Sequence, residues 1–129
     1  MTFSFPSSFR FAQSHEYASV EGENIRIGIS AFAVDQLGDI VFVDLPDVGS
    51  VLTKATSFGS VESVKAVEDM YSPISGEVIQ INDSVLASPE ELQNDPHGKG
   101  WLLLVKPADT NQLNDLFSAD EYGKKVSGN

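Results

Sequence analysis

The sequence contains no cysteine among its 129 residues. Disulfide bonds, thiolate nucleophiles and cysteine-ligated metal sites are therefore excluded for the polypeptide itself. The longest uninterrupted apolar run, WLLLV at 101–105, is far shorter than the roughly 20 residues that cross a bilayer as a helix. The first residues are Ser-rich and free of acid, but they run directly into ordered-looking sequence, so we interpret them as part of the mature chain.

Positive charge is also scarce. Eight Lys and Arg stand against nineteen Asp and Glu, which gives a formal net charge of −11. This balance argues against binding to nucleic acid, whose phosphates must be neutralised by basic side chains, and against anionic membrane surfaces. It is compatible with basic protein partners, or with acidity that only keeps the protein in solution.

The residues that most enzymes rely on are missing as well. The two histidines, His15 and His97, are isolated in the sequence, so we expect them to be structural or solvated rather than catalytic. No nucleophile elbow, calcium loop or glycine-rich phosphate loop occurs, and the chain offers too few ligands for zinc. We therefore expect a protein without catalytic or metal-binding residues of its own.

What is present is a series of short strands. Segment 24–30 alternates isoleucine with polar or small residues, which is typical of a half-buried strand. Similar apolar segments at 39–46, 77–82 and 101–107 predict further strands.

Three small helices are predicted around these strands. The first spans 31–37, with Ser30 as its N-cap and Gly38 just past its end. The second spans 89–94, with a capping box formed by Ser88 and Glu91. The third is a helical pattern at 108–125, in which Leu113, Leu116 and Phe117 share a face and Ser118 with Glu121 forms another capping box.

Together these elements predict one mainly β domain over 1–129, an all-β sandwich or half-barrel with small flanking helices. Its core should cover about 9–122, and the tail 126–129 should be flexible.

Lys65 occupies an unusual position in the segment ESVKAVEDMYSPISGEV. It lies between Val64 and Ala66, at what reads as a tight reversal between two strands. An amine at the tip of a hairpin is exposed and firmly held, so it could carry an acyl cofactor as a swinging arm. From spacing alone, an ordinary solvated strand lysine is the favoured explanation.

The segment GSVESVKAVEDMYSPISGEVIQIN resembles the lipoyl-lysine segment of the glycine cleavage system H protein family. SHEY at 14–17, IGIS through LGDIVFVDLPDVG at 28–49 and NDPHGKGWLLLVKP at 94–107 are similar to other motifs of that family, so the resemblance covers roughly residues 9–122. Tyr17 stands where the family has tryptophan. The resemblance implies a lipoyl-domain-like fold, a barrel-sandwich hybrid, with lipoate as the covalent cofactor on Lys65.

The resemblance also implies a function. The protein would be a non-catalytic carrier that takes the aminomethyl group of glycine from a pyridoxal-phosphate glycine decarboxylase to a tetrahydrofolate-dependent aminomethyltransferase. Dihydrolipoamide dehydrogenase would then reoxidise the arm, and a lipoyl-attaching enzyme would load it first. We expect a cytoplasmic protein, or a mitochondrial matrix protein if this is a processed eukaryotic chain.

Several residues gain possible roles from the same resemblance. Glu16 and Asp69, with Ser14 and Ile29 nearby, are candidates for a cleft that holds the loaded arm, although both acids could be solvated surface residues. Glu62, Gly49 and Gly76 match positions that the family uses for recognition by the lipoyl-attaching enzyme. The two glycines could equally be structural turn residues with positive φ.

Three alternative interpretations of Lys65 differ in their fit to the sequence. A biotin carrier should have Met on both sides of its lysine, whereas Lys65 has Val64 and Ala66. Lipoyl domains of 2-oxoacid dehydrogenases typically read Asp-Lys-Ala and lack the flanking helices. A lipoate relay or scaffold protein that passes lipoyl groups to other carriers also needs Lys65, so the sequence leaves that alternative open.

Overall fold

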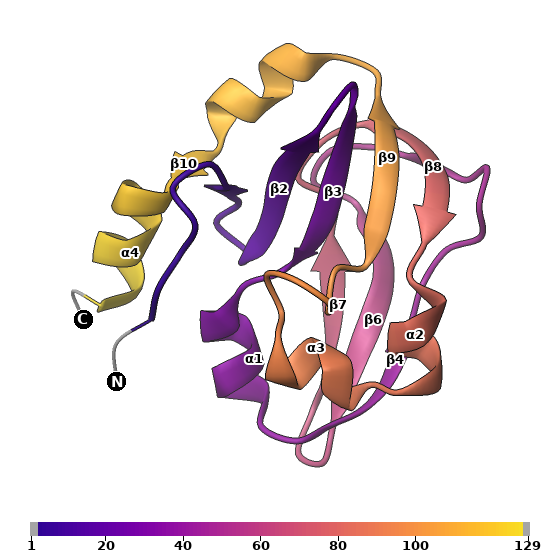
Figure 1. The fold of residues 1–129 in the computed structure, drawn as a ribbon, viewed down its shortest axis with the longest axis vertical. Helices are drawn as coiled ribbons and strands as arrows, with labels where there is room; N and C mark the ends of the chain where they lie inside the picture. Colours follow the sequence, from indigo (N-terminus) through magenta and orange to yellow (C-terminus); the bar gives the residue numbers. More distant parts are fainter. Residues whose placement is uncertain (1–2, 128–129) are drawn as a thin grey trace.

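The computed structural model describes residues 3–127 and confirms the predicted mainly β fold with small helices at its edges (Figure 1). The strands form a seven-stranded sheet of order β10-β1-β2-β3-β9-β8-β5 and a three-stranded sheet of order β4-β6-β7. The elements in chain order are β1 (Arg10–Phe11), β2 (Glu16–Glu21), β3 (Asn24–Ile29), α1 (Ala31–Leu37), β4 (Ile40–Asp44), β5 (Val51–Leu52), β6 (Ser57–Ser63), β7 (Val67–Tyr71), β8 (Gly76–Ile81), α2 (Asp83–Ala87), α3 (Glu90–Asn94), β9 (Leu103–Pro107), the 3-10 helix η1 (Thr110–Asp115), β10 (Phe117–Ser118) and α4 (Ala119–Ser127).

One buried cluster joins the two sheets. It takes Ile27 from β3 and Val105 from β9 on one side, and Val61 from β6 and Met70 from β7 on the other. Burial of these side chains, each worth about 1.5–3 kcal/mol, holds the sheets together as the expected barrel-sandwich. None of the helices within residues 3–127 is long and apolar enough to span a bilayer.

A second, aromatic cluster attaches the C-terminal helix. Phe11 and Tyr122 stack with their ring centroids 4.4 Å apart, and Phe9 and Tyr17 complete the cluster. Aromatic pairs of this kind add about 0.5–1.5 kcal/mol beyond the area they bury. Strand β1 and helix α4 are therefore held to the body by side chains from opposite ends of the chain.

The first half of the chain agrees closely with the local predictions. The Ser30 hydroxyl accepts a hydrogen bond from the Ala33 N–H at 3.1 Å and caps α1, and Gly38 follows the helix with φ of 80°. Ile25, Ile27 and Ile29 are buried in β3, as the alternation predicted. Gly59 lies at a register shift between β6 and β7, and Gly49 has φ of 95° in a turn.

The region 83–94 contains one helix more than predicted. Helix α3 (Glu90–Asn94) matches the predicted helix at 89–94, but α2 was missed. The predicted capping box at Ser88 is wrong, because α3 has no side-chain cap. Asn82 instead caps α2 through the Ser84 N–H, and Ser88 ends that helix by donating its backbone N–H to the Ser84 carbonyl.

The C-terminal segment is helical only in parts. The predicted helix at 108–125 is interrupted, because Phe117 lies in β10 and pairs with Phe11 rather than sharing a helical face with Leu113. The capping box of Ser118 and Glu121 is confirmed, with backbone-to-side-chain bonds of 2.9 and 3.1 Å in the two directions.

The tail was predicted to be flexible from residue 126. Val126 and Ser127 lie in α4, and Val126 packs against the aromatic cluster, while the flexibility of the tail stays a prediction. Residues 128–129 lie outside the described residues.

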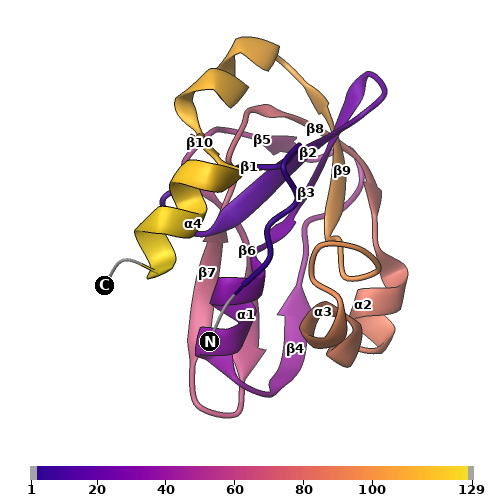
Figure 2. The same ribbon diagram turned by 60° about the vertical axis from the view of Figure 1, so that its left-hand side comes forward.

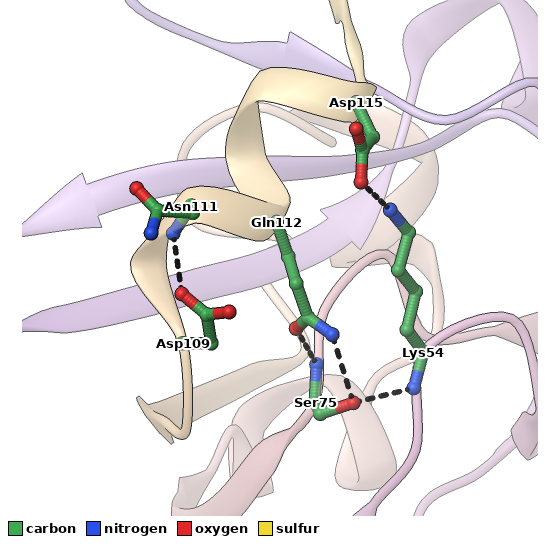
Figure 3. Close-up of polar contacts among 6 residues, drawn as sticks. All are labelled: Lys54, Ser75, Asp109, Asn111, Gln112 and Asp115. Carbon is green, nitrogen blue, oxygen red and sulfur yellow. Dashed lines mark hydrogen bonds and ion pairs between the residues drawn. The ribbon is translucent and has the colours of Figure 1, made fainter.

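Between β9 and β10, η1 is fastened to the turns that precede β6 and β8 (Figure 3). The Lys54 Nζ contacts an Asp115 carboxylate oxygen at 2.7 Å. The Gln112 side chain accepts a bond from the Ser75 N–H at 2.7 Å, and the Ser75 hydroxyl accepts one from the Lys54 N–H at 2.9 Å. These contacts hold the crossing from β9 to α4 against the turns that precede β6 and β8.

Candidate functional site

The hairpin of β6 and β7 forms the lower end of the molecule in both views (Figures 1 and 2). The two strands pair up to Glu62 and Val67, and the Ser63 N–H donates to the Ala66 carbonyl at 2.8 Å to close the reversal. Lys65 lies at this tip and its side chain is exposed. None of the ion pairs among the described residues involves it.

The tip is held by more than the strand pairing. The Ser63 hydroxyl accepts bonds from the backbone N–H groups of Lys65 at 3.3 Å and Ala66 at 3.2 Å. The Val64 N–H donates to the Asp39 carbonyl at 3.0 Å, which ties the hairpin to the loop between α1 and β4. The amine of Lys65 thus extends from a backbone that is fixed on both sides.

A cavity of about 350 Å³ lies between this hairpin and α1. All four residues predicted for an arm cleft line it, although they come from separate parts of the chain: Ser14, Glu16, Ile29 and Asp69. Most of the remaining wall comes from α1, β6 and β7 and is mainly apolar, including Phe32, Leu37, Val61 and Met70. The cavity therefore combines an apolar lining with carboxylates, and it lies beside β7, the strand that follows Lys65 in the chain.

Glu16 is the buried acid of this cavity, with 2% of its surface exposed. It begins β2, opposite Ile29 of β3. One carboxylate oxygen accepts a bond from the Tyr71 N–H at 2.9 Å, and the other accepts the Ser14 hydroxyl. Burial raises the pKa of the Glu16 carboxyl, and the bonds from Ser14 and Tyr71 oppose that rise. Glu16 is therefore not the solvated surface acid of the alternative interpretation.

Asp69 is exposed in β7 and also lines the cavity. Glu68 lines the same cavity and pairs with Val61 across the hairpin, and the sequence analysis did not single it out. Strand alternation could have found it, because Glu68 shares the parity of the buried Met70.

His15 also lines the cavity, in a strained backbone conformation with φ of 84°. Its Nδ1 lies 2.6 Å from the Tyr122 hydroxyl, which in turn lies 2.7 Å from the Ser30 hydroxyl that caps α1. Burial, with a smaller effect from Lys125, lowers the pKa of His15, and burial raises the pKa of Tyr122 to about 12. Both groups are uncharged at neutral pH and link α4 to the wall of the cavity.

His97 lies in the aromatic cluster and has a structural role. Its Nε2 accepts a bond from the Ala31 N–H at 3.1 Å, at the start of α1. Burial lowers the pKa of His97, while the nearby Asp95 opposes this effect. The two histidines thus fit the structural role expected of them.

The three residues predicted for recognition by an attaching enzyme are not brought together. Glu62 is exposed on β6, close to the tip. Gly76 begins β8, and Gly49 donates its N–H to Val78 of the same strand at 2.7 Å. Strand β8 stands towards the end opposite the hairpin tip in both views, and β5 does so in Figure 2 (Figures 1 and 2).

Gly49 and Gly76 require glycine for different structural reasons. Gly49 has φ of 95°, a conformation that favours glycine, as the turn interpretation expected. Gly76 is not among the positive-φ residues, so a turn with positive φ is wrong for it. A Cβ atom there would collide with the Lys106 carbonyl oxygen and the Val105 side chain of β9.

Comparisons with known proteins agree with this geometry. A family model described as "Glycine cleavage H-protein" matches residues 9–129. Glycine cleavage system H proteins of Synechococcus sp. (strain CC9605) and Parasynechococcus marenigrum (strain WH8102) are 72% and 70% identical over 127 residues, with 98% of both chains covered in each case. The crystal structure of a glycine cleavage system H protein from Mycobacterium marinum has a TM-score of 0.88 at 34% identity, covering 97% of this chain and 100% of that one.

Proposed function

The chain belongs to the glycine cleavage H-protein family, and from this premise we propose that it carries lipoate as an amide on Lys65. When attached, lipoate would supply a dithiolane that accepts the aminomethyl group left after decarboxylation of glycine, passes its carbon to a folate acceptor with release of ammonia, and is reoxidised from the dithiol. The proposed partners are the glycine decarboxylase, the aminomethyltransferase, dihydrolipoamide dehydrogenase and a lipoyl-attaching enzyme. The chain itself catalyses no step in this proposal, and we expect the system in the cytoplasm of a bacterial cell.

The observation that carries the proposal is the joint position of Lys65 and the cavity. Lys65 is exposed at a tip fixed by the Ser63 hydroxyl and by Asp39, and the cavity runs along the same hairpin. Acylation removes the charge of the amine, so an arm attached there can lie on the apolar walls with little desolvation cost. The residues present therefore fit a lipoyl group.

The carboxylates of the cavity would bind the amine of the aminomethyl group carried by the arm. An aminomethyl group on a sulfur atom ends in a primary amine that is cationic at neutral pH, so it needs an acidic partner. Glu16, which is buried, and Asp69, which is exposed, both line the cavity, so they are the candidates to bind that amine. The apolar lining would limit access of water to the loaded arm, which is prone to hydrolysis.

The test is the glycine decarboxylation exchange reaction, reconstituted with the decarboxylase and this chain. Lys65→Arg keeps the charge and the fold but cannot form the amide, so exchange should fall to the level without carrier. Lys106→Arg, an exposed strand lysine on β9, is the matched control and should exchange like the wild type.

Two results would contradict the proposal. Exchange supported by Lys65→Arg would mean that another group carries the cargo. A lipoylated wild-type chain that transfers lipoyl groups to other carriers but never accepts carbon from labelled glycine would favour the lipoate relay.

A further inference from the structure

Four exposed apolar side chains surround the tip that bears Lys65. Val64 is 70% exposed, Val67 64%, Phe42 55% and Val41 50%. Single exposed apolar residues are common on soluble proteins, but a cluster of them marks an interaction surface. We refer to Val41, Phe42, Val64 and Val67 as the tip patch.

Strand pairing shows that the patch is one surface. Phe42 of β4 lies opposite Glu62 of β6, which lies opposite Val67 of β7, so these three side chains form a row across one face of the three-stranded sheet. A register shift between Ile40 and Phe42 leaves both Val41 and Phe42 exposed. Val64 joins them at the tip, where its N–H is bonded to the Asp39 carbonyl.

The next row of the same face is acidic. Asp44 of β4 lies opposite Ser60 of β6, which lies opposite Asp69 of β7. With Glu62 in the centre of the first row, the apolar side chains are bordered and divided by carboxylates. The face is complementary to an apolar surface that carries Lys or Arg around it.

Lys65 is the exception to this acidic character. Segment 31–72, which contains α1, β4, the hairpin and their connections, has seven acidic residues and only two basic ones, Lys54 and Lys65. Lys54 is paired with Asp115 at 2.7 Å. The charge on Lys65 is therefore the one in this segment that would repel a basic partner, and acylation removes it.

Resting on the proposed function, we propose that the tip patch docks the glycine decarboxylase through an apolar face rimmed by Lys and Arg on that enzyme, and that acylation of Lys65 strengthens the docking. In the proposed function this enzyme loads the arm, so docking on an unmodified chain is unproductive and a preference for the acylated tip is useful. The apolar row supplies the contact, and the loss of one positive charge supplies the discrimination.

The experiment measures the dissociation constant between the full chain and purified glycine decarboxylase by isothermal titration calorimetry. Phe42→Ser and Val67→Ser should each weaken binding by at least about tenfold, as expected for central apolar contacts. Val51→Ser is the matched control, because Val51 is 79% exposed on β5 in the other sheet, and it should bind like the wild type. Thermal unfolding of each variant checks that the fold is retained.

The charge effect is tested with Lys65→Gln, which is neutral and bears no arm. It should bind about threefold more tightly than the unmodified wild type at low ionic strength, and the difference should shrink at high salt because the interaction is screened. Equal binding of Lys65→Gln and unmodified wild type at low salt overturns the charge discrimination. Wild-type binding by both patch variants overturns the docking surface.

Failure of the proposed function gives a different result. If lipoate is never attached to Lys65 in the wild type, the carrier role fails, whichever way the patch variants bind. If mass spectrometry shows attachment to the wild type and to both patch variants, while their binding is unchanged, only the inference about docking fails.

Discussion

At the scale of single residues, the buried carboxylate of Glu16 lowers the stability of the fold, and the proposed function offers a reason for it. Its carboxylate is buried, and the Ser14 hydroxyl, the Tyr71 N–H and the backbone of Glu16 itself stabilise its charge. Burial raises the pKa of Glu16 above its ordinary value, so the ionised form costs stability at neutral pH. A cationic ligand beside this carboxylate would offset that cost, and the amine of a loaded arm is the ligand that we propose.

Glu16→Gln tests this account of the buried carboxylate. The amide can accept the Tyr71 N–H and bond Ser14 while removing the charge, so the free energy of unfolding at pH 7 should rise by up to about 1 kcal/mol. Because the folded-state pKa of Glu16 lies above the unfolded one, this advantage should disappear as the pH falls through both values and the wild-type carboxyl becomes protonated. Urea unfolding at pH 7 and near pH 4 measures both quantities.

The same variant should release its cargo more readily. Without a charged partner for the amine, the Glu16→Gln chain, once loaded with the aminomethyl group, should lose its label in buffer faster than the wild type does. A loaded variant that is as long-lived as the wild type, or a variant that is less stable at pH 7, would contradict the role assigned to Glu16.

His15 and His97 predict a loss of stability in mild acid. Burial lowers the pKa of both groups in the folded state, so the unfolded chain takes up protons first as the pH falls below about 6.5. The contribution of the two histidines to the free energy of unfolding is therefore complete above that pH and declines below it. Protonation of Glu16 in the folded state changes the free energy of unfolding in the opposite direction. His97→Gln can still accept the Ala31 N–H, so its free energy of unfolding should decline less than that of the wild type between pH 7 and pH 5. Parallel pH profiles for the two proteins would rule out this assignment.

At the scale of elements, the hairpin of β6 and β7 combines exposure with rigidity. Its end is fixed by the Ser63 hydroxyl and by the bond between the Val64 N–H and the Asp39 carbonyl. An arm attached at Lys65, as we propose, could move while its anchor does not, which would keep the dithiolane at high effective concentration near a docked active site.

Ser63→Ala should loosen this anchor without unfolding the protein. The variant loses the acceptor for the N–H groups of Lys65 and Ala66, which should lower the free energy of unfolding by about 1 kcal/mol. Amide hydrogen exchange at these two residues should become faster, and enzymatic lipoylation should slow. Ser57→Ala, at the far end of β6, is the control and should leave exchange at the tip unchanged. Equal exchange at the tip in Ser63→Ala and wild type would show that the hydroxyl does not hold it.

At the scale of the whole molecule, local signals predicted local structure. The alternation in β3, the Ser30 cap of α1 and the Ser118–Glu121 box are each set by neighbouring residues, and all three are confirmed. Ser88 was misread because Asn82 starts a helix before it, and two overlapping caps cannot be ranked from sequence. Phe117 was misread because its strand exists only through pairing with Phe11, more than a hundred residues away.

The candidate site also contains features that neighbouring residues predict and features that depend on distant parts of the chain. Lys65 could be located from its segment, and its exposed position at the tip agrees with the predicted reversal. The four cleft residues came from family resemblance, because no local pattern brings Ser14 and Glu16 next to β7. Glu68 and the tip patch emerge only from the pairing of β4, β6 and β7 in three dimensions.

The most direct test of the central claim is intact and peptide mass spectrometry of the chain after incubation with lipoate and a lipoyl-attaching system. The account predicts one lipoyl group, on the peptide that contains Lys65, and none on Lys65→Arg. Absence of any acyl group on the wild type, or its attachment to a different lysine, would contradict the account.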